Sequence, residues 1–473
     1  MKDLSYEAVL ARNNEIMSKA MGIDYGAFEI SPLAFDYEGL MNKAGYFLEV
    51  VQAIQRKAGV GNTPLLELRN LTALVRTYAR PGKGARILVK DEAANPSGSF
   101  KDRRASVSVY HAKKNGYPGV IAATSGNYGA AVASQAAMMG LKCIIVQEVY
   151  DSKRIGQPEI IEKTRKCEAL GAEVVQLTVG PELFYLSLRL LEETGFFNAS
   201  LYSPLGISGT ETLGYEIATQ VRERYGKEPA AVITTHAGGG NVTGTARGLL
   251  KAGCTNTSMV GVSVDLTGLH MASDIDFNRK SFTTGHTGFS VPFTTWPDRS
   301  DVPRSAARPL RYLDRYVTVT QGEVFYVTQA LSEVEGMERG PAGNTSLAAA
   351  LAIAAEYDQD DIIVVQETEY TGAGKHPMAQ LNFAKSMGVE VRRGDPDDNV
   401  PGRVIVIPQR FEQLHVTEHS LDKLRWSYIR KAVENSGMSC LTNVEVKFLA
   451  GETRTSEDWV TGVLKELGVQ LAL

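Results

Sequence analysis

One lysine in the sequence stands where a side chain could act as a covalent catalyst. Lys101 lies in the run NPSGSFKDR, between an apolar segment predicted to be a strand and an apolar-rich segment predicted to be a helix. Loops at strand ends deliver functional groups in α/β proteins, and an amine kept partly unprotonated by its surroundings can form a Schiff base with an aldehyde. The alternative is that Lys101, Asp102, Arg103 and Arg104 form only the polar first turn of a helix.

Two further segments are suited to binding anions. Thr124, Ser125 and Asn127 lie between a predicted strand and a predicted helix, where backbone N–H groups favour a carboxylate. A simple turn capped by Ser or Asn is the alternative. The run Gly238–Val242 has the same position, and its consecutive glycines let backbone N–H groups converge on a phosphate. The lysine of a P-loop is missing from it, which disfavours that kind of nucleotide site.

Other polar residues give weaker signals. The hydroxyl of Thr371, after the strand-like run DIIVVQ, could meet the nitrogen of a heterocycle. His236, just before the glycines, is expected to be a packed residue at a strand end. Lys163, Arg165 and Lys166 are expected to lie on a solvated helix face.

An α/β scaffold is predicted to hold these segments together. Apolar strands alternate with amphipathic helices, which indicates mostly parallel sheets covered on both faces. The tail is expected to contain a strand at 403–407 and a helix at 420–434. We expect an N-terminal helical arm (1–60), a large domain (61–104 and 206–395), a small mobile domain (105–205) and a C-terminal extension (396–473).

Composition limits the class of protein. The chain has 473 residues and a formal net charge of −4, with basic and acidic residues nearly balanced, so a nucleic acid partner is not expected. The sequence lacks an apolar run of about 18 residues, so a membrane span is not expected. Its four cysteines are far apart, which argues against a metal centre or a disulfide framework and favours a cytoplasmic location.

The order of several motifs resembles that of a known enzyme superfamily. GNTPL, NPSGSFKDR, SGNYGAA, the glycine run and TGAGK together resemble the fold type II enzymes that use pyridoxal 5'-phosphate (PLP), the tryptophan synthase β and threonine synthase superfamily, over about residues 60 to 390. The resemblance implies an α/β fold of two open, parallel-rich sheets flanked by helices. The cofactor would lie between a large and a small domain.

The resemblance also implies how the cofactor would be held. Lys101 would bind PLP covalently and later carry protons at Cα and Cβ, and Asn127 would bind the phenolic oxygen. Thr371 would face the pyridine nitrogen, where a neutral hydroxyl favours chemistry at Cβ over transamination. The phosphate would be cradled by the backbone of Gly238, Gly239, Gly240, Asn241 and Val242.

The substrate site is implied in the same way. Thr124, Ser125 and Asn127 would receive the carboxylate of a small amino acid. Tyr128 stands where threonine is usual in this superfamily, so the shape of the pocket beside the substrate is expected to differ.

Over its whole length the chain resembles the β subunits of 2-amino-4-ketopentanoate thiolase, a family of ornithine degradation. The resemblance implies an acyltransferase that cleaves 2-amino-4-oxopentanoate with coenzyme A (CoA) to acetyl-CoA and alanine. Lys101 would remove the Cα proton, and the CoA thiolate would attack the C4 ketone. A smaller α subunit is the implied partner, on a dimeric core.

Two other functions remain open on the same residues. A threonine synthase-like or dehydratase-like lyase acting at Cβ would also use Lys101, so no motif separates it from the thiolase. A noncatalytic interaction or nucleotide-binding module is disfavoured, because the SFKDR run and the glycine run are both intact.

Overall fold

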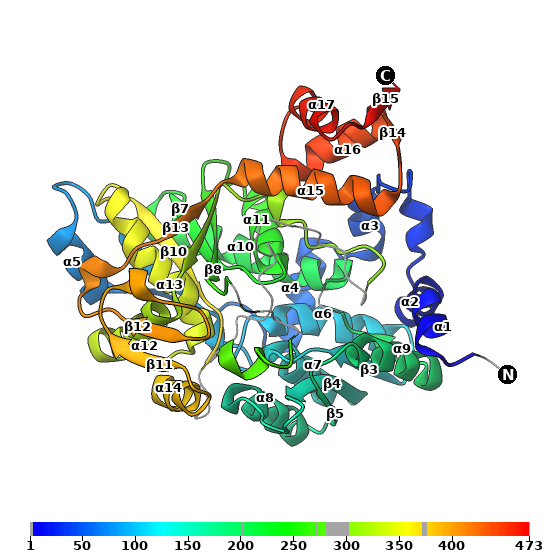
Figure 1. Cartoon of the computed structure of the whole chain (residues 1–473), viewed down its shortest axis with the longest axis horizontal. Coiled ribbons are helices and arrows are strands. Elements are labelled where there is room, and N and C mark those ends of the chain that lie inside the picture. Colours follow the sequence, from blue (N-terminus) through cyan, green and yellow to red (C-terminus); the bar gives the residue numbers. More distant parts are fainter. Residues whose placement is uncertain are drawn as a thin grey trace.

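The structure is a computed structural model that describes residues 3–200, 202–267, 269, 273–280, 302–370 and 376–472. Two main sheets with helices around them form its body (Figure 1). The strands of the larger sheet, in their order across it, are β1 (Leu65–Glu67), β2 (Arg86–Asp91), β10 (Ile362–Glu367), β7 (Ala231–Thr235), β8 (Ser258–Val264), β9 (Arg315–Val319) and β13 (Thr417–His419).

The inner strands of this sheet are parallel, and β1 and β13 run antiparallel at its two edges. Every residue of β10 is buried, as expected for an apolar strand that is covered on both faces. Because successive side chains point to opposite faces, Ile363 and Val365 pack into one hydrophobic cluster while Ile362 and Val364 pack into another.

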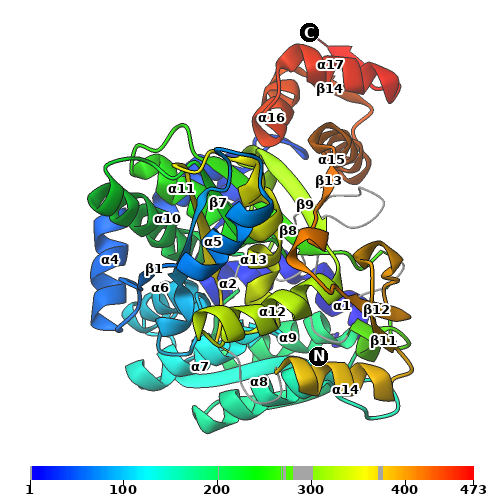
Figure 2. The ribbon, with the colours of Figure 1, turned by 90° about the vertical axis from the view of Figure 1, so that its left-hand side faces the viewer.

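Helices supply the rest of both clusters (Figure 2). On the face of Ile363 they are α5 (Arg69–Tyr78), α12 (Gln321–Glu335) and α13 (Pro341–Ile353); on the face of Ile362 they are α10 (Pro204–Tyr225), α11 (Gly240–Lys251) and α15 (Leu421–Ser436). α10 and α11 approach so closely that a Cβ on Gly214 would lie 1.9 Å from the backbone oxygen of Thr245. This contact fixes α11, which begins in the glycine run.

The smaller sheet is parallel throughout. Its strands, in order, are β5 (Glu173–Thr178), β4 (Lys142–Tyr150), β3 (Gly119–Ala123) and β6 (Phe197–Asn198). The helices between and before these strands are α6 (Lys101–Lys114), α7 (Asn127–Met139), α8 (Pro158–Ala169) and α9 (Glu182–Thr194). Because α6 follows β2 of the large sheet and leads into β3, it links the two sheets.

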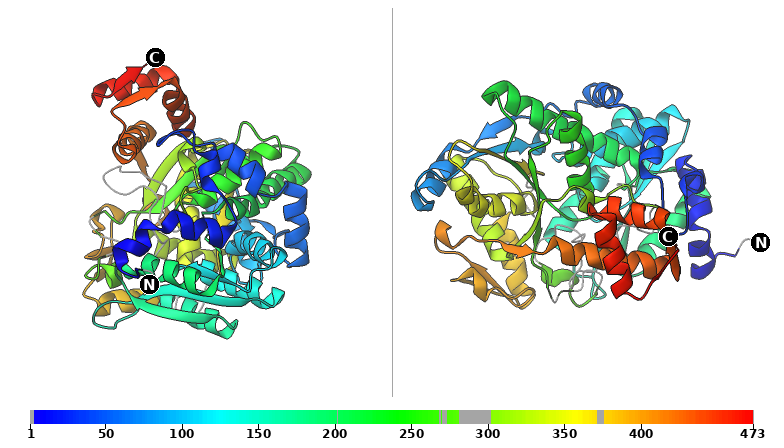
Figure 3. Two further views of the ribbon diagram at one scale, coloured as in Figure 1. Left: turned by 90° about the vertical axis from the view of Figure 1, so that its right-hand side faces the viewer. Right: turned by 90° about the horizontal axis from the view of Figure 1, so that it is seen from above.

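The N-terminal helices lie along the side of the molecule (Figure 3). They are α1 (Tyr6–Ala11), α2 (Asn13–Met21), α3 (Tyr37–Ala44) and α4 (Leu48–Lys57). Arg12, between α1 and α2, forms an ion pair of 3.3 Å with Glu192 of α9. Gln55 of α4 donates hydrogen bonds to the backbone oxygens of Arg103 (3.0 Å) and Gly209 (2.7 Å). The N-terminal segment therefore braces α6 and α10.

The C-terminal part has two roles in the fold. β13 widens the large sheet through its antiparallel pairing with β9. α15 packs against the same hydrophobic cluster as α11, and the last elements stand out from the body (Figures 1 and 2). The other elements of this part are α14 (Pro377–Ser386), β11 (Glu390–Arg393), β12 (Val404–Ile407), β14 (Cys440–Thr442), α16 (Asn443–Thr453), α17 (Glu457–Glu466) and β15 (Gln470–Ala472). Of the helices in the described ranges, none has the length and apolar character needed to span a membrane.

Candidate active site

Three loops of the large sheet meet at one edge. β2, β10 and β7 are neighbours and parallel, so the loops that follow them lie side by side at their carboxyl ends. Backbone hydrogen bonds join two of these loops, from Phe100 N–H to the oxygen of Thr368 (3.1 Å) and from Tyr370 N–H to the oxygen of Gly98 (2.9 Å). The segment before Lys101 is thus fastened to the end of β10.

Lys101 is the first residue of α6, and its amine lies among buried charges. Its Nζ is 4.2 Å from the centre of the Phe100 ring. Burial and the positive charge of Arg104 hold the pKa of Lys101 well below that of an ordinary lysine, and the carboxylate of Glu369 offsets only part of this effect. Because the unprotonated amine is the nucleophile, Lys101 is chemically suited to attack an aldehyde.

Lys101 and the three charged residues after it form the first turn of α6, but these three residues are buried rather than a plain polar surface turn. Asp102, Arg103 and Arg104 each expose 2% or less of their surface. Arg103 donates to Glu92 (Nε to Oε2, 2.6 Å) and to Glu216 (Nη2 to Oε2, 2.8 Å). These ion pairs fix the helix start that carries Lys101.

The glycine run forms the loop between β7 and α11, and its surroundings leave no space for side chains. A Cβ on Gly238 would lie 1.6 Å from Oη of Tyr202, and one on Gly240 would lie 2.8 Å from Nη2 of Arg104. Gly239 has a φ of +82°, a conformation that side chains disfavour. Only backbone can therefore line this part of the site.

The first turn of α11 has the donors that a phosphate requires. Among the described residues, no side chain caps this helix. Asn241 is 6% exposed, and its Nδ2 has no hydrogen-bond partner among the described residues. Uncapped N–H groups, an unused amide donor and the neighbouring guanidinium of Arg104 together suit a buried anion. The residues present therefore fit a phosphorylated cofactor.

The segment from Thr124 to Asn127 lies between β3 and α7, at the edge of the small sheet. Gly126 is the N-cap of α7, and in the part of the chain that the structure describes no side chain caps the helix. Oγ1 of Thr124 accepts a hydrogen bond from Gly126 N–H (3.1 Å). The Ser or Asn cap considered as the alternative is thus not formed. The segment is partly exposed, so its polar groups can reach a ligand.

Arg104 connects this segment to the glycine run. Burial lowers the pKa of Arg104, and the nearby phenol groups of Tyr202 and Tyr128 oppose that shift. Arg104 also donates to Oγ1 of Thr210 (3.2 Å). The structure thus brings the α7 start, the glycine run and Lys101 around one guanidinium.

Several buried charges near Lys101 were not predicted as site residues. The solvated helix face expected for Lys163 is wrong, because Lys163 is 4% exposed and forms an ion pair with Glu159 (2.5 Å). Burial alone would lower the pKa of Lys163, but Glu159 and Glu369 outweigh it and raise the pKa. Lys166 is exposed, as expected, and its amine donates to the backbone oxygen of Ser97.

The two remaining residues considered from the sequence are Thr371 and His236. Thr371 lies outside the described residues. His236 is fully buried, and burial lowers its pKa to about 4. Its ring packs edge-on against Tyr316, with 5.5 Å between the ring centres. His236 is therefore a packed strand-end residue, as expected.

Glu369 offers a test of the charges around Lys101. Since its carboxylate favours the protonated amine, Glu369→Gln should lower the pKa of Lys101 further. We expect trapping of an aromatic aldehyde on Lys101 by borohydride, located by peptide mass, to extend to lower pH. The exposed Glu338→Gln serves as the control and should leave the pH profile unchanged. A shift to higher pH would contradict this account.

The chain is similar to known proteins along its entire length. A family model described as pyridoxal-phosphate dependent enzyme matches residues 57–369. A 2-amino-4-ketopentanoate thiolase β subunit from an unknown prokaryotic organism is 70% identical over 470 residues, covering 99% of this chain and 100% of that protein. The protein of the same name from Acetoanaerobium sticklandii is 64% identical over 466 residues, covering 98% and 99%.

A solved structure shares the fold of most of the chain. A threonine deaminase from T.th. superimposes with a TM-score of 0.53 at 27% identity, covering 69% of this chain and 98% of that one.

Proposed function

Since this chain belongs to the family of pyridoxal-phosphate dependent enzymes, we propose that it is the β subunit of a 2-amino-4-ketopentanoate thiolase. The observation that carries the proposal is the 70% identity to a protein of that name over 470 residues. Because 470 of the 473 residues are aligned, the similarity includes nearly all of residues 396–473, which lie outside the family match at 57–369.

The proposed reaction is a thiolysis. The thiolate of CoA attacks the C4 ketone carbon of 2-amino-4-oxopentanoate, and the C3–C4 bond breaks with its electron pair left on C3. The acetyl group is transferred to sulfur as acetyl-CoA. C3 takes up a proton, and the remaining three-carbon amino acid is alanine. Atoms and electrons balance without an oxidant or a reductant.

The cofactor site is proposed from groups that fit one another. Lys101 would hold PLP covalently, and the backbone of Gly238–Val242, with the buried cation of Arg104 beside it, would hold the phosphate. Asn127 would bind the phenolic oxygen, and Thr371 would face the pyridine nitrogen. When bound, PLP supplies an electron sink for the negative charge that develops beside the amino group of the substrate.

The remaining work falls to side chains of the protein. Thr124, Ser125 and Asn127, at the uncapped start of α7, would orient the substrate carboxylate, with Tyr128 shaping the pocket beside them. Lys101 would remove the proton at Cα and return one to C3. Its lowered pKa supports this role, because a larger fraction of the amine is then unprotonated and able to accept a proton.

The variant Gly238→Ala tests the phosphate cradle. The added Cβ would lie 1.6 Å from Oη of Tyr202, so the loop must shift. Overpacking of this kind costs about 1–3 kcal/mol, so affinity for PLP should fall by about 10- to 100-fold. Titration of the apoenzyme with PLP measures this change. Gly462→Ala, where nothing lies within 4 Å, should keep the wild-type affinity. Equal affinities in the two variants would exclude this loop as the cradle.

The decisive experiment is an assay with 2-amino-4-oxopentanoate, CoA and the α subunit. We expect acetyl-CoA and alanine in equal amounts, and their absence would overturn the thiolase proposal. The structural similarity to threonine deaminase favours a lyase acting at Cβ as the second candidate. Release of phosphate from O-phosphohomoserine, or of ammonia from threonine, would support that candidate instead.

The proposal also covers the subunits of the enzyme and its location in the cell. The smaller α subunit would complete the enzyme on a dimeric core, and the unit at 105–205 would close over the substrate. We propose a cytoplasmic location, which the four free cysteines support.

A further inference from the structure

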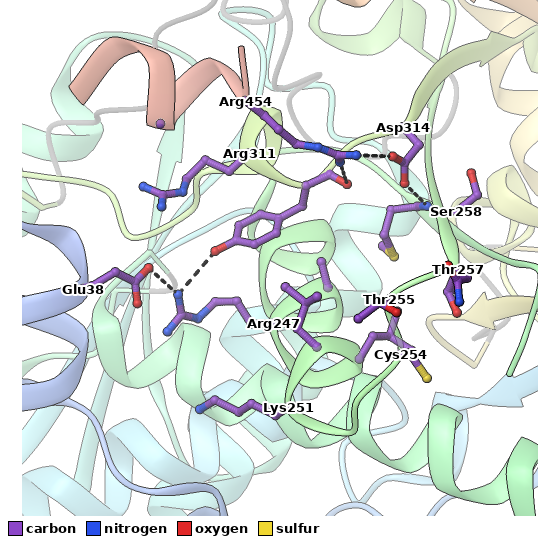
Figure 4. Close-up of a pocket in the computed structure, with 17 residues that line it drawn as sticks. Glu38, Arg247, Lys251, Cys254, Thr255, Thr257, Ser258, Arg311, Asp314 and Arg454 are labelled. Atoms are coloured by element: carbon purple, nitrogen blue, oxygen red, sulfur yellow. Dashed lines mark hydrogen bonds and ion pairs between the residues drawn. The ribbon is translucent and has the colours of Figure 1, made fainter. Parts of the chain in front are cut away.

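Apart from the candidate active site, the structure has a cavity at the far end of α11 from the glycine run. It has a volume of 910 Å³. Arg247 and Lys251 come from the last turns of α11, Arg311 and Asp314 from the segment before β9, and Arg454 from the residue after α16 (Figure 4). Because α11 has 12 residues, its ends are about 18 Å apart. Ala246, midway along α11, also lines the cavity, but its lining includes no residue of the glycine run or of the segments at Lys101 and Thr124, so the cavity is separate from the candidate active site.

The C-terminal part of the chain completes this cavity. Gly451 and Arg454 line it, and both lie beyond the family match at 57–369. Arg454 donates to Asp314 (Nη2 to Oδ1, 2.7 Å), which ties the end of α16 to the segment before β9. The enzyme core shared with the family supplies one wall, and the extension supplies the other.

Positive charge exceeds negative charge on the cavity wall. Glu211, 1% exposed, accepts from both Arg247 (2.7 Å) and Lys251 (2.5 Å). Glu452, 2% exposed as a side chain, accepts from Arg311 (2.8 Å) and also from Arg308. Each buried carboxylate thus serves two cations, which leaves two positive charges in excess, and Glu38 offsets one of them through its pair with Arg247.

The guanidinium groups of Arg247 and Arg311 lie beside Glu38, and Lys251 lies farther from it (Figure 4). Burial alone would raise the pKa of Glu38, but the hydrogen bond from Arg247 and the charges of Arg247, Arg311 and Lys251 outweigh it and lower the pKa. The side chain of Glu38 is 49% exposed and accepts from Arg247 at 2.7 Å. Within the described part of the chain, the guanidinium of Arg311 hydrogen bonds only to Glu452. It therefore retains N–H groups that can bind an anion.

The cavity also offers apolar and aromatic surface. Leu250, which is 55% exposed, lines the cavity together with Met259 and Tyr312. A volume of 910 Å³ far exceeds what a single phosphate fills, and it lies in the usual range for sites that enclose organic ligands. A planar base could pack on this surface while its phosphate groups meet the guanidinium forks.

We propose that this cavity binds a nucleoside phosphate, with the phosphate groups held by Arg247, Lys251 and Arg311. The ligand has two conceivable sources: the adenosine 3',5'-bisphosphate end of CoA, or a free adenine nucleotide. Only the CoA source rests on the proposed function. Glu38 occupies the place of an anion beside Arg247 and Arg311, so it competes with the ligand.

The test is calorimetric titration of the PLP-loaded protein with adenosine 3',5'-bisphosphate. Arg311→Gln and Lys251→Gln should each weaken binding by about tenfold, since each removes a charge-assisted hydrogen bond. Each variant leaves one cation on its buried carboxylate, so the fold should persist. Glu38→Gln should tighten binding several-fold. The control is Arg430→Gln on α15, outside the cavity, which should bind as the wild type does.

Titrations with CoA, dephospho-CoA and ADP identify the source. Tighter binding of CoA than of dephospho-CoA supports CoA, and the tightest binding by ADP supports a free nucleotide. The proposal is overturned if wild type and Glu38→Gln both fail to bind at millimolar ligand, or if all variants bind alike. It is also overturned if the variants lose only assembly with the α subunit, because the cavity would then hold protein. These readouts do not depend on thiolase activity, so either proposal can fail alone.

Discussion

The Lys101→Ala variant is expected to purify without the visible absorption of bound PLP and to lose thiolysis by about 10³-fold or more. Lys101 is proposed both to attach the cofactor and to move protons, so one substitution removes both. The fold should persist, because the position opens α6 and alanine favours helices. Absorption spectra and the acetyl-CoA assay measure the two effects.

Two other lysines make this prediction specific. Lys114→Ala, at the exposed end of the same helix, should retain colour and activity. Lys163 is the rival buried amine near the site, but its raised pKa keeps it protonated and therefore poorly nucleophilic. Borohydride reduction should fix PLP to Lys101 alone. A coloured, active Lys101→Ala protein would mean that another lysine holds the cofactor.

The loops of the site were predictable because their signals are local. The apolar segments predicted to be strands before Lys101 and before the glycine run are β2 and β7. An apolar run that stops at glycines and resumes as a helix depends little on distant parts of the chain. The α/β fold of fold type II and the resemblance to PLP enzymes are likewise confirmed.

The buried charges could not be predicted in the same way. Arg104 and Lys163 have the residue types of a protein surface, and only tertiary partners show that they are inside. One signal was available for Lys163. Glu159, Lys163 and Cys167 are spaced by four residues, so they share a face of α8, and that face ends in an apolar residue.

In the C-terminal part, some elements were predicted from the sequence and one strand was not. The strand expected at 403–407 and the helix expected at 420–434 correspond to β12 and α15. The edge strand β13 was not predicted, because its three residues, Thr417–His419, are polar and mostly exposed. Such a strand has no apolar alternation, and its pairing with β9 is set by the sheet rather than by its own sequence.

The Arg103→Met variant is expected to lower the free energy of unfolding by about 3–5 kcal/mol. Arg103 and Glu92 are both fully buried, and their side chains meet at 2.6 Å. Methionine fills much of the same space but leaves Glu92 as a buried charge without its main partner. Glu216 suffers less, because it keeps Lys90 at 2.9 Å. Urea denaturation of the apoenzyme measures the loss.

The stability that this buried network provides should depend on pH. Burial alone would raise the pKa of Glu216, but Arg103 and Lys90 hold it well below its usual value of 4.5. A carboxylate with a lowered pKa stabilises the fold above that usual value, and this stability is lost as the pH falls below it. On acidification, the free energy of unfolding of Arg103→Met should therefore fall less than that of the wild type. Arg86→Met, whose pair with Glu67 is partly exposed, should cost less than about 1 kcal/mol at neutral pH. Equal costs for Arg103→Met and Arg86→Met would mean that the network does not fix the helix start that carries Lys101.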